Sequence, residues 1–179
     1  MSFMRLKPVI AAIAVASAML GAGLAQAQEG ISALKGHDRR APIDLAADRA
    51  EAQDRADRAI FAGNVVVRQG DLTLRTTRLT LAYASQNGID INRIDASGGV
   101  VVTSPSETAK GDFAVYDLDQ GLITMVGNVR LERGGSYLSG ARLTIDLDTG
   151  RAVMDGGLRG VNQGGGRVTG RFTVPKRGN

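Results

Sequence analysis

The residues of this chain with the clearest potential for chemistry are aspartates in two similar segments. Asp117-Leu118-Asp119-Gln120-Gly121 and Asp146-Leu147-Asp148-Thr149-Gly150 are near copies, and paired carboxylates beside glycine occur in calcium-binding loops. Neither copy has the further oxygen ligands or the closing glutamate of an EF-hand, and the glycine-rich nonapeptides of calcium-binding β-rolls are absent. We therefore interpret both segments as hairpin turns that recur because the unit around them recurs, and we predict no metal site.

Other catalytic constellations are equally weak in this sequence. A paired-carboxylate glycosidase is the sharper enzymatic alternative, but no spacing places two of the aspartates across a cleft. His37 has no serine in a nucleophile elbow near it, so we interpret it as a solvated residue of a flexible leader. Gly164-Gly165-Gly166 lacks the lysine and the helix of a phosphate loop. The chain has no cysteine, which excludes disulfides and thiol nucleophiles. We predict no catalytic residue, no cofactor and no enzymatic activity.

The segment from Met1 to Ala27 has the arrangement of a secretory signal. Arg5 and Lys7 precede an apolar run over residues 9–24, which ends at the small-x-small sequence Ala25-Gln26-Ala27. We predict cleavage there, with a mature chain that begins near Gln28 and works outside the cytoplasm. The alternative is an uncleaved membrane anchor, because an apolar run of this length approaches the lower limit for a bilayer span.

Composition and alternation indicate an all-β fold that follows this leader. The 179 residues include 24 glycines, no tryptophan and 4% aromatic side chains, which favours short strands joined by tight turns over packed helices. Val65 and Val67 alternate with Asn64 and Arg68, and the same split recurs further along the chain, which predicts strands with one apolar and one polar face. We predict turns at Gln69-Gly70-Asp71, Gly98-Gly99 and Gly134-Gly135.

Two markers recur along the predicted strands. The first is a glycine at positions 63, 98, 127 and 156. The second begins at positions 78, 112, 142 and 171, so the spacing between the two markers is nearly constant. Periods of 20 to 50 residues are typical of stacked units that cannot bury their apolar faces alone. The sequence therefore predicts about four stacked β units.

The two ends of this array carry no polar cap. Residues 43–47 and 168–174 both have the pattern of ordinary strands, and an open edge strand is a template for another strand. We predict that these edges pair with another copy or another protein by strand addition. The candidate partner-binding residues are Ile43, Leu45, Val168, Arg171, Phe172 and Val174.

Several short motifs together resemble the LptA family of periplasmic lipopolysaccharide transport proteins, which contain the OstA-like domain. They are the export signal, Pro42-Ile43 followed by Ala46-Ala47-Asp48, residues 63–70, Ala109-Lys110-Gly111-Asp112, and Gly127-Asn128-Val129. The resemblance covers roughly residues 41–158. It implies an open β-jellyroll of stacked, V-shaped antiparallel layers. It also implies a periplasmic bridge of head-to-tail copies between an LptC-like inner-membrane partner and an LptD-like outer-membrane partner, with no role for nucleic acid.

With this resemblance, we expect a cleaved signal at 1–27, a flexible lead at 28–41, the OstA-like domain at 42–174 and a basic disordered tail at 175–179. Lipopolysaccharide would slide along the apolar interior in this picture. The alternatives are a membrane-anchored LptC-like partner, a structural β-solenoid that binds proteins only, and an exported polysaccharide-active enzyme.

Alternation assigns fifteen apolar side chains to the inner face of the predicted sheet. Two interpretations of these side chains are open: they line a groove for lipid, or they fill a closed core. The residues are Val65, Val67, Leu72, Leu74, Leu79, Leu81, Val100, Val102, Phe113, Val115, Met125, Val129, Leu131, Leu143 and Ile145.

The modest net charge of +4 hides an uneven distribution. Removing the predicted signal leaves +2, and from residue 151 onward six basic side chains accompany one acidic side chain, so residues 28–150 carry −3. A basic end of this kind suits an acidic end of a neighbouring molecule or the phosphates of a lipid, and a solvated tail is the alternative.

Overall fold

The computed structural model describes residues 34, 37–85, 88–157 and 166–174. The predicted signal at 1–27, residues 28–33 and 35–36 of the predicted lead, and the predicted tail at 175–179 lie outside these residues. The described residues form one ten-stranded antiparallel sheet and one short 3-10 helix, η1 (Asp54–Ala56). The strands are β1 (Ile43–Ala46), β2 (Arg49–Gln53), β3 (Arg58–Gln69), β4 (Leu72–Ala84), β5 (Asp90–Thr103), β6 (Glu107–Asp117), β7 (Leu122–Arg133), β8 (Ser136–Asp146), β9 (Arg151–Asp155) and β10 (Thr169–Arg171).

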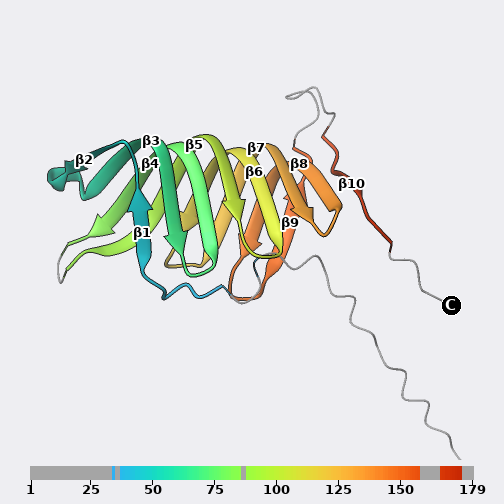
Figure 1. The fold of residues 1–179 in the computed structure, drawn as a ribbon, viewed down its shortest axis with the longest axis horizontal. Helices are drawn as coiled ribbons and strands as arrows, with labels where there is room; N and C mark the ends of the chain where they lie inside the picture. Colours follow the sequence, from blue (N-terminus) through green and yellow to red (C-terminus); the bar gives the residue numbers. More distant parts are fainter. Residues whose placement is uncertain (1–33, 35–36, 86–87, 158–165, 175–179) are drawn as a thin grey trace, which may run out of the picture.

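The strands follow one another along the long axis of the molecule (Figure 1). From β3 to β8 each strand pairs with the next strand of the sequence, so the middle of the sheet is a meander. The predicted all-β open antiparallel architecture is therefore confirmed. No helix in the described part of the chain is long and apolar enough to cross a membrane.

The repeated glycines mark corners at which the sheet bends. Gly63 and Asn64 have φ of 80° and 45°, and Gly127 and Asn128 have φ of 82° and 48°. The pairing register shifts at each of these sites, because two consecutive residues with left-handed backbone form a bulge that bends the strand. Gly98-Gly99 forms the matching corner inside β5, so our prediction of a turn there is wrong.

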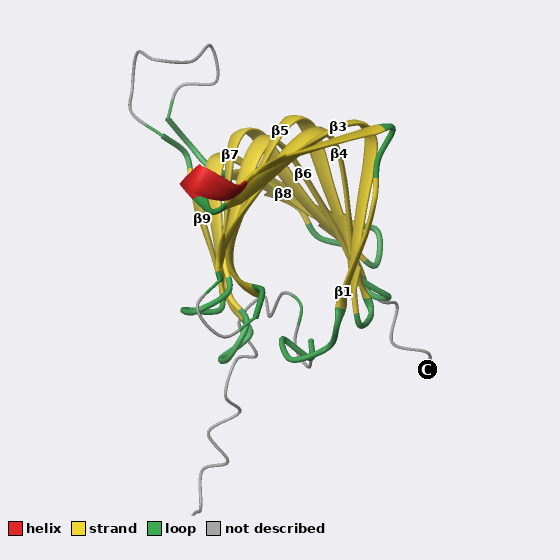
Figure 2. Ribbon diagram, turned by 90° about the vertical axis from the view of Figure 1, so that its left-hand side faces the viewer, coloured by secondary structure: helices red, strands yellow, loops and turns green. Residues whose placement is uncertain are grey.

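The corners fold the sheet into an arch with two limbs (Figure 2). We call the side with β1 and β10 at its edges the first limb and the side with β2 and β9 at its edges the second limb. The hairpin turns of the two limbs lie along the open side of the arch, which we call the mouth. The inner surface between the limbs, from β3 to β8, is called the trough below.

Both edges of the sheet are split at a corner. β1 pairs with β3 on the first limb, and β2 pairs with the same strand on the second limb. At the other end, β9 and β10 both pair with β8 in the same manner. The predicted edge strands therefore exist, although the second is shorter than predicted: β10 spans only Thr169–Arg171 of residues 168–174.

Candidate functional site

Registered rows of apolar side chains run through the trough from one edge to the other. Residues directly opposite each other in an antiparallel pair share a face, so the strand register fixes the members of each row. The second limb contains the row Phe61, Leu79, Ala96, Ala114, Met125, Leu143 and Met154. The first limb contains the row Leu45, Val67, Leu74, Val102, Ala109, Leu131 and Leu138.

Most of the predicted inner residues lie in this core. Leu79, Met125 and Leu143 have no exposed surface, so the side chains of the trough are closely packed in this structure. Their contact with lipid stays a prediction. The buried members of the predicted set are Val65, Val67, Leu72, Leu74, Leu79, Leu81, Val100, Val102, Met125, Val129, Leu131, Leu143 and Ile145.

Two of the predicted inner residues face the other way. Phe113 is 56% exposed and Val115 is only half-buried, whereas Ala114 and Tyr116 take the inner positions of β6. Residues 113–116 are four consecutive apolar residues, so the alternation of apolar and polar side chains does not show which of them face inward. The repeat did contain the missing signal: Phe113 follows Gly98 at the same spacing at which an arginine follows each of the other repeat glycines.

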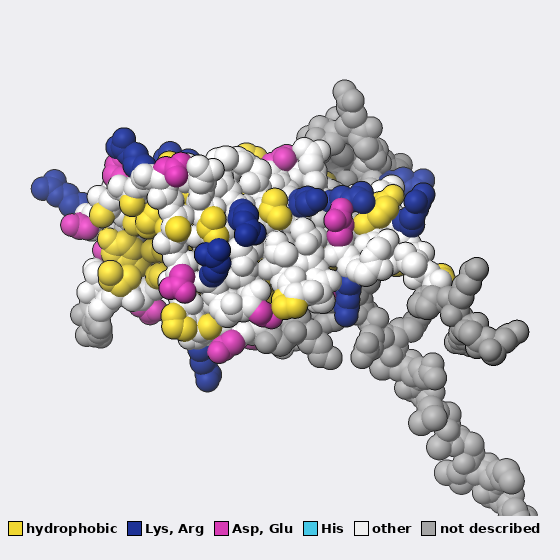
Figure 3. All heavy atoms as spheres, in the orientation of Figure 1, with side chains coloured by type: hydrophobic (Ala, Val, Ile, Leu, Met, Phe, Trp, Pro, Cys, Tyr) yellow, Lys and Arg dark blue, Asp and Glu magenta, His cyan; other side chains and the backbone are white. Residues whose placement is uncertain are grey.

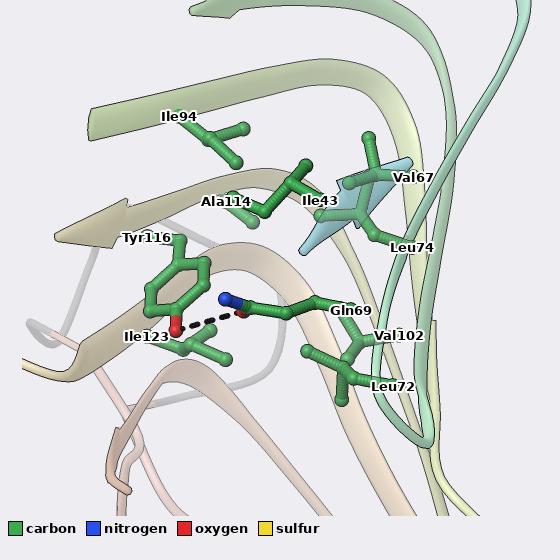
Figure 4. Close-up of a pocket in the computed structure, with 10 residues that line it drawn as sticks. All are labelled: Ile43, Val67, Gln69, Leu72, Leu74, Ile94, Val102, Ala114, Tyr116 and Ile123. Carbon is green, nitrogen blue, oxygen red and sulfur yellow. Dashed lines mark hydrogen bonds between the residues drawn. The ribbon is translucent and has the colours of Figure 1, made fainter. Parts of the chain in front are cut away.

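A polar bridge that the sequence did not reveal joins the limbs near the mouth (Figure 4). Gln69, at the end of β3 on the first limb, reaches Tyr116 on the second limb. The Tyr116 hydroxyl donates a hydrogen bond to Gln69 Oε1 over 3.1 Å, and both residues are buried. Burial raises the pKa of the Tyr116 hydroxyl, while the nearby Arg39 charge opposes this shift and Asp148 adds to it. The hydroxyl therefore stays a protonated donor at neutral pH.

His37 belongs to this network, and our prediction that it is solvated is wrong. Its side chain is 1% exposed. Its Nε2 lies 3.1 Å from Gln69 Oε1, and its Nδ1 lies 3.2 Å from Asp71 Oδ1. These partners are 32 and 34 residues away in sequence, so local polarity around the histidine could not indicate its burial.

The segment that carries His37 crosses the mouth, and we call Leu34 together with residues 37–41 the strap. Arg39 reaches the second limb, where Nη1 donates to the Leu118 carbonyl over 3.1 Å and Nη2 lies 3.0 Å from Asp148 Oδ1. Leu34 is 6% exposed and its backbone N–H donates to Glu107 Oε2 over 2.7 Å. The strap therefore contacts both limbs.

The two aspartate segments are hairpin turns, as predicted. Residues 118–121 and 147–150 connect strands β6 to β7 and β8 to β9. Asp117 Oδ1 accepts a hydrogen bond from the Gln120 N–H, and Asp146 Oδ1 accepts from the N–H groups of Asp148 and Thr149. These bonds, that of Thr149 first, hold the pKa of Asp146 below its ordinary value. Among the described residues, no three histidine or acidic side chains are grouped to hold a metal ion.

The outer face of the first limb is basic. Arg75, Lys110 and Arg130 belong to one cross-strand row, with Val101 between the first two, and we call these three cations the basic row. Figure 3 shows Lys and Arg side chains along the middle of the molecule. Arg130 pairs with Glu132 over 2.6 Å and lies above the Tyr137 ring. The two faces of the sheet therefore differ sharply in polarity.

The predicted edge residues divide into two groups. Ile43 and Leu45 are partly buried and pack against the core from β1. At the other edge, Arg171 pairs with Tyr137 of β8. Val168, Phe172 and Val174 lie outside β10 and are 40%, 59% and 83% exposed. Their binding to a partner stays a prediction.

A protein-family model described as "LptA/(LptD N-terminal domain) LPS transport protein" matches residues 44–151, which is more than half of the chain. The chain belongs to this family. Members of the LptA family are transport proteins and not enzymes, which agrees with the expectation drawn from the sequence.

Individual relatives support the same placement. An uncharacterized protein of Rhizobium meliloti (strain 1021) is 34% identical over 160 residues, which cover 82% of this chain and 85% of that protein. The lipopolysaccharide export system protein LptH of Pseudomonas aeruginosa is 25% identical over 67% of this chain and 70% of its own length. The LPS-assembly protein LptD of Yersinia enterocolitica is 32% identical over 58% of this chain, but this match covers only 14% of LptD.

The fold agrees with a solved member of the LptA family. The crystal structure of Pseudomonas aeruginosa LptH, described as the LptA-homologous periplasmic component of the lipopolysaccharide transport device, superposes with a TM-score of 0.67. The superposition covers 77% of this chain and 99% of LptH at 20% sequence identity. This likeness establishes the LptA-like fold of the chain.

Proposed function

We propose that this protein carries lipopolysaccharide through the periplasm, with the acyl chains in the trough and the polar head at the mouth. Transfer of an acyl chain of about twelve carbons into water costs on the order of 10 kcal/mol, at roughly 0.8 kcal/mol per methylene. A continuous apolar surface removes most of this cost without any catalytic residue. The observation that carries the proposal is the unbroken course of the apolar rows between the two sheet edges.

The closed packing of the trough sets a condition on this function. Side chains such as Leu79, Met125 and Leu143 leave no exposed surface, so an acyl chain has to replace contacts between the two limbs. An open sheet permits this separation, because no strand closes the mouth covalently or by pairing in the described residues. The free-energy cost of breaking the contacts between the limbs is partly recovered, because the acyl chain offers the same kind of apolar contact.

The split edges support a bridge of several molecules. Backbone groups on the outer sides of β1 and β10 have no strand beside them in the described sheet. Hydrophobic side chains also gather at the end of the molecule that carries β2 (Figure 3). Strand addition at both ends would join the trough of one copy to the next, or to LptC-like and LptD-like partners at the two membranes. A cleaved signal would place the protein in the periplasm.

Site-specific photo-crosslinking tests the trough. A photoreactive amino acid at Leu81 or Met125 should capture purified lipopolysaccharide, whereas the same group at Arg75, on the outer face, should not. Both inner positions are buried, and Arg75 is exposed. Capture at Arg75 without capture at either inner position would refute the trough as the lipid path. Capture at none of the three positions would favour the alternative of a structural protein that binds no lipid.

A further inference from the structure

The strap ties the two limbs together across the mouth. On the first limb, His37 contacts Gln69 and Asp71. On the second limb, Arg39 contacts the Leu118 carbonyl and the Asp148 carboxylate. A segment held from both sides in this way restrains the separation of the limbs that lipid entry needs.

Gln69 is the main polar anchor of the strap. Its Nε2 donates to the carbonyls of Arg39 and Ala41 over 2.8 and 3.2 Å, which fixes the orientation of the amide. Its Oε1 accordingly accepts from Tyr116 and from His37 Nε2. All four hydrogen-bonding positions of the amide are thereby used, and three of them serve the strap. Each ring nitrogen of His37 therefore lies within hydrogen-bonding distance of a side-chain oxygen.

Leu34 is buried in the core beside an apolar slot between the limbs. Besides Leu34, the slot is lined by Val102, Glu107, Ala109 and Leu131 of the first limb and by Ile145 of the second. The four apolar residues of the sheet among them are buried members of the trough. The alkyl side chain of Leu34 thus contacts the same apolar core that an acyl chain would have to enter.

We propose that the strap is a displaceable plug, which fills the entrance of the lipid-free trough and is expelled when acyl chains enter. This proposal rests on the lipid-carrying function proposed above and adds a control on loading. An acyl chain replaces the apolar contacts of Leu34. Hydroxyl groups of the lipid head take over the hydrogen-bonding positions that the strap vacates on Gln69 and Glu107, so no buried polar group is left unpaired.

The first arm of the test follows the strap directly, in the full-length chain. The protein has no cysteine, so a single introduced thiol reports on its own position. In Leu34→Cys, the thiol should react slowly with a maleimide, and lipopolysaccharide should accelerate the reaction about tenfold or more. Phe113→Cys, on the exposed outer face, should react at the same rate with and without lipid. A thiol at position 34 that stays protected after lipid has bound would overturn the plug.

The second arm measures lipid affinity after the strap is loosened. Arg39→Ala removes the contacts with the second limb and should raise the affinity for lipopolysaccharide about three- to tenfold, because less of the protein is then held in the closed state. Arg40→Ala is the matched control. It removes the same charge from the next residue, whose side chain makes no hydrogen bond or ion pair within the described structure, and it should leave affinity unchanged. Equal affinities in all three proteins would overturn the plug.

The two proposals fail in different ways. If neither the wild-type protein nor Arg39→Ala binds lipopolysaccharide, the lipid-carrying function and the plug are both wrong. If the wild-type protein binds lipid while position 34 stays protected and Arg39→Ala changes nothing, only the plug is wrong.

Discussion

At the corners of the arch, individual atoms decide which side chains fit. The Asp112 carboxylate lies against Gly127 and accepts a hydrogen bond from Asn128 Nδ2 over 2.8 Å. The first corner repeats this arrangement with Asp48, Gly63 and Asn64. A Cβ on Gly127 would collide with the carboxylate, whereas a Cβ on Gly99 would meet open space. The second corner residue therefore tolerates a side chain in its left-handed conformation, as both asparagines show.

Replacement of these glycines separates backbone strain from collision. Gly99→Ala and Gly127→Ala both place alanine at a φ near +80°, a change that costs about 1–2 kcal/mol. Gly127→Ala should lose more stability, because the Asp112 carboxylate has to move and its bond to Asn128 is broken. The free energy of unfolding from urea titration measures both variants. Equal losses of stability in the two variants would show that the Asp112 carboxylate can move away without an energetic cost.

At the scale of elements, the sequence pattern predicted strands more reliably than the direction in which they face. The alternation in β3, β4 and β8 is regular, so the inner residues of these strands were predicted correctly. In β6 both faces are apolar, and only the pairing register with the neighbouring strands shows which side chains face the trough. The strap escaped prediction for a related reason: its partners are turns and strand ends far away in sequence.

The β8–β9 turn should depend on the charge of Asp146. The folded-state pKa of Asp146 lies below its ordinary value, so its contribution to stability is present above the unfolded pKa and is lost as the pH falls through the folded pKa. Asp146→Asn should therefore melt at a lower temperature than the wild-type protein at neutral pH. The difference in melting temperature between the two proteins should become smaller as the pH falls below the usual pKa range of carboxyl groups.

A control for this effect is available in the preceding turn. Asp119→Asn removes a carboxylate that makes no hydrogen bond or ion pair in the described structure. Melting curves of the control should differ little from those of the wild-type protein across the same pH range. A pH-independent gap for Asp146→Asn would contradict the proposed role of its charge.

At the scale of the whole molecule, the charges of the two sheet edges differ. The C-terminal edge is basic, with Arg167 and the β10 residue Arg171 both exposed. The N-terminal edge is mixed: it presents Asp44 of β1 and Glu51 of β2, and Glu51 lies 3.7 Å from Arg49 of the same strand. Head-to-tail contact would bring these edges together, and the attraction between them would be strongest at low ionic strength.

Charge reversal tests this contact. Arg167→Glu with Arg171→Glu should weaken self-association at low salt, and the effect should fade as salt increases. Arg75→Glu with Lys110→Glu changes the charge of the molecule equally, but on the basic row in the middle of the sheet, and should leave association unaffected. Analytical ultracentrifugation at several protein concentrations measures the self-association of the two double variants. The same loss in both would indicate a dependence on net charge and not on the edge.

The repeated corner also governs the length of the molecule. Neighbouring strands in a sheet lie about 4.8 Å apart, and each repeat contributes two strands, so each repeat extends the trough by about 10 Å. Strand length, by contrast, sets the depth of the limbs, and the corners set their angle. Span and cross-section are therefore independent variables of this architecture. Duplication of one repeat, from Gly98 to Val126, would therefore lengthen the trough and leave its cross-section unchanged.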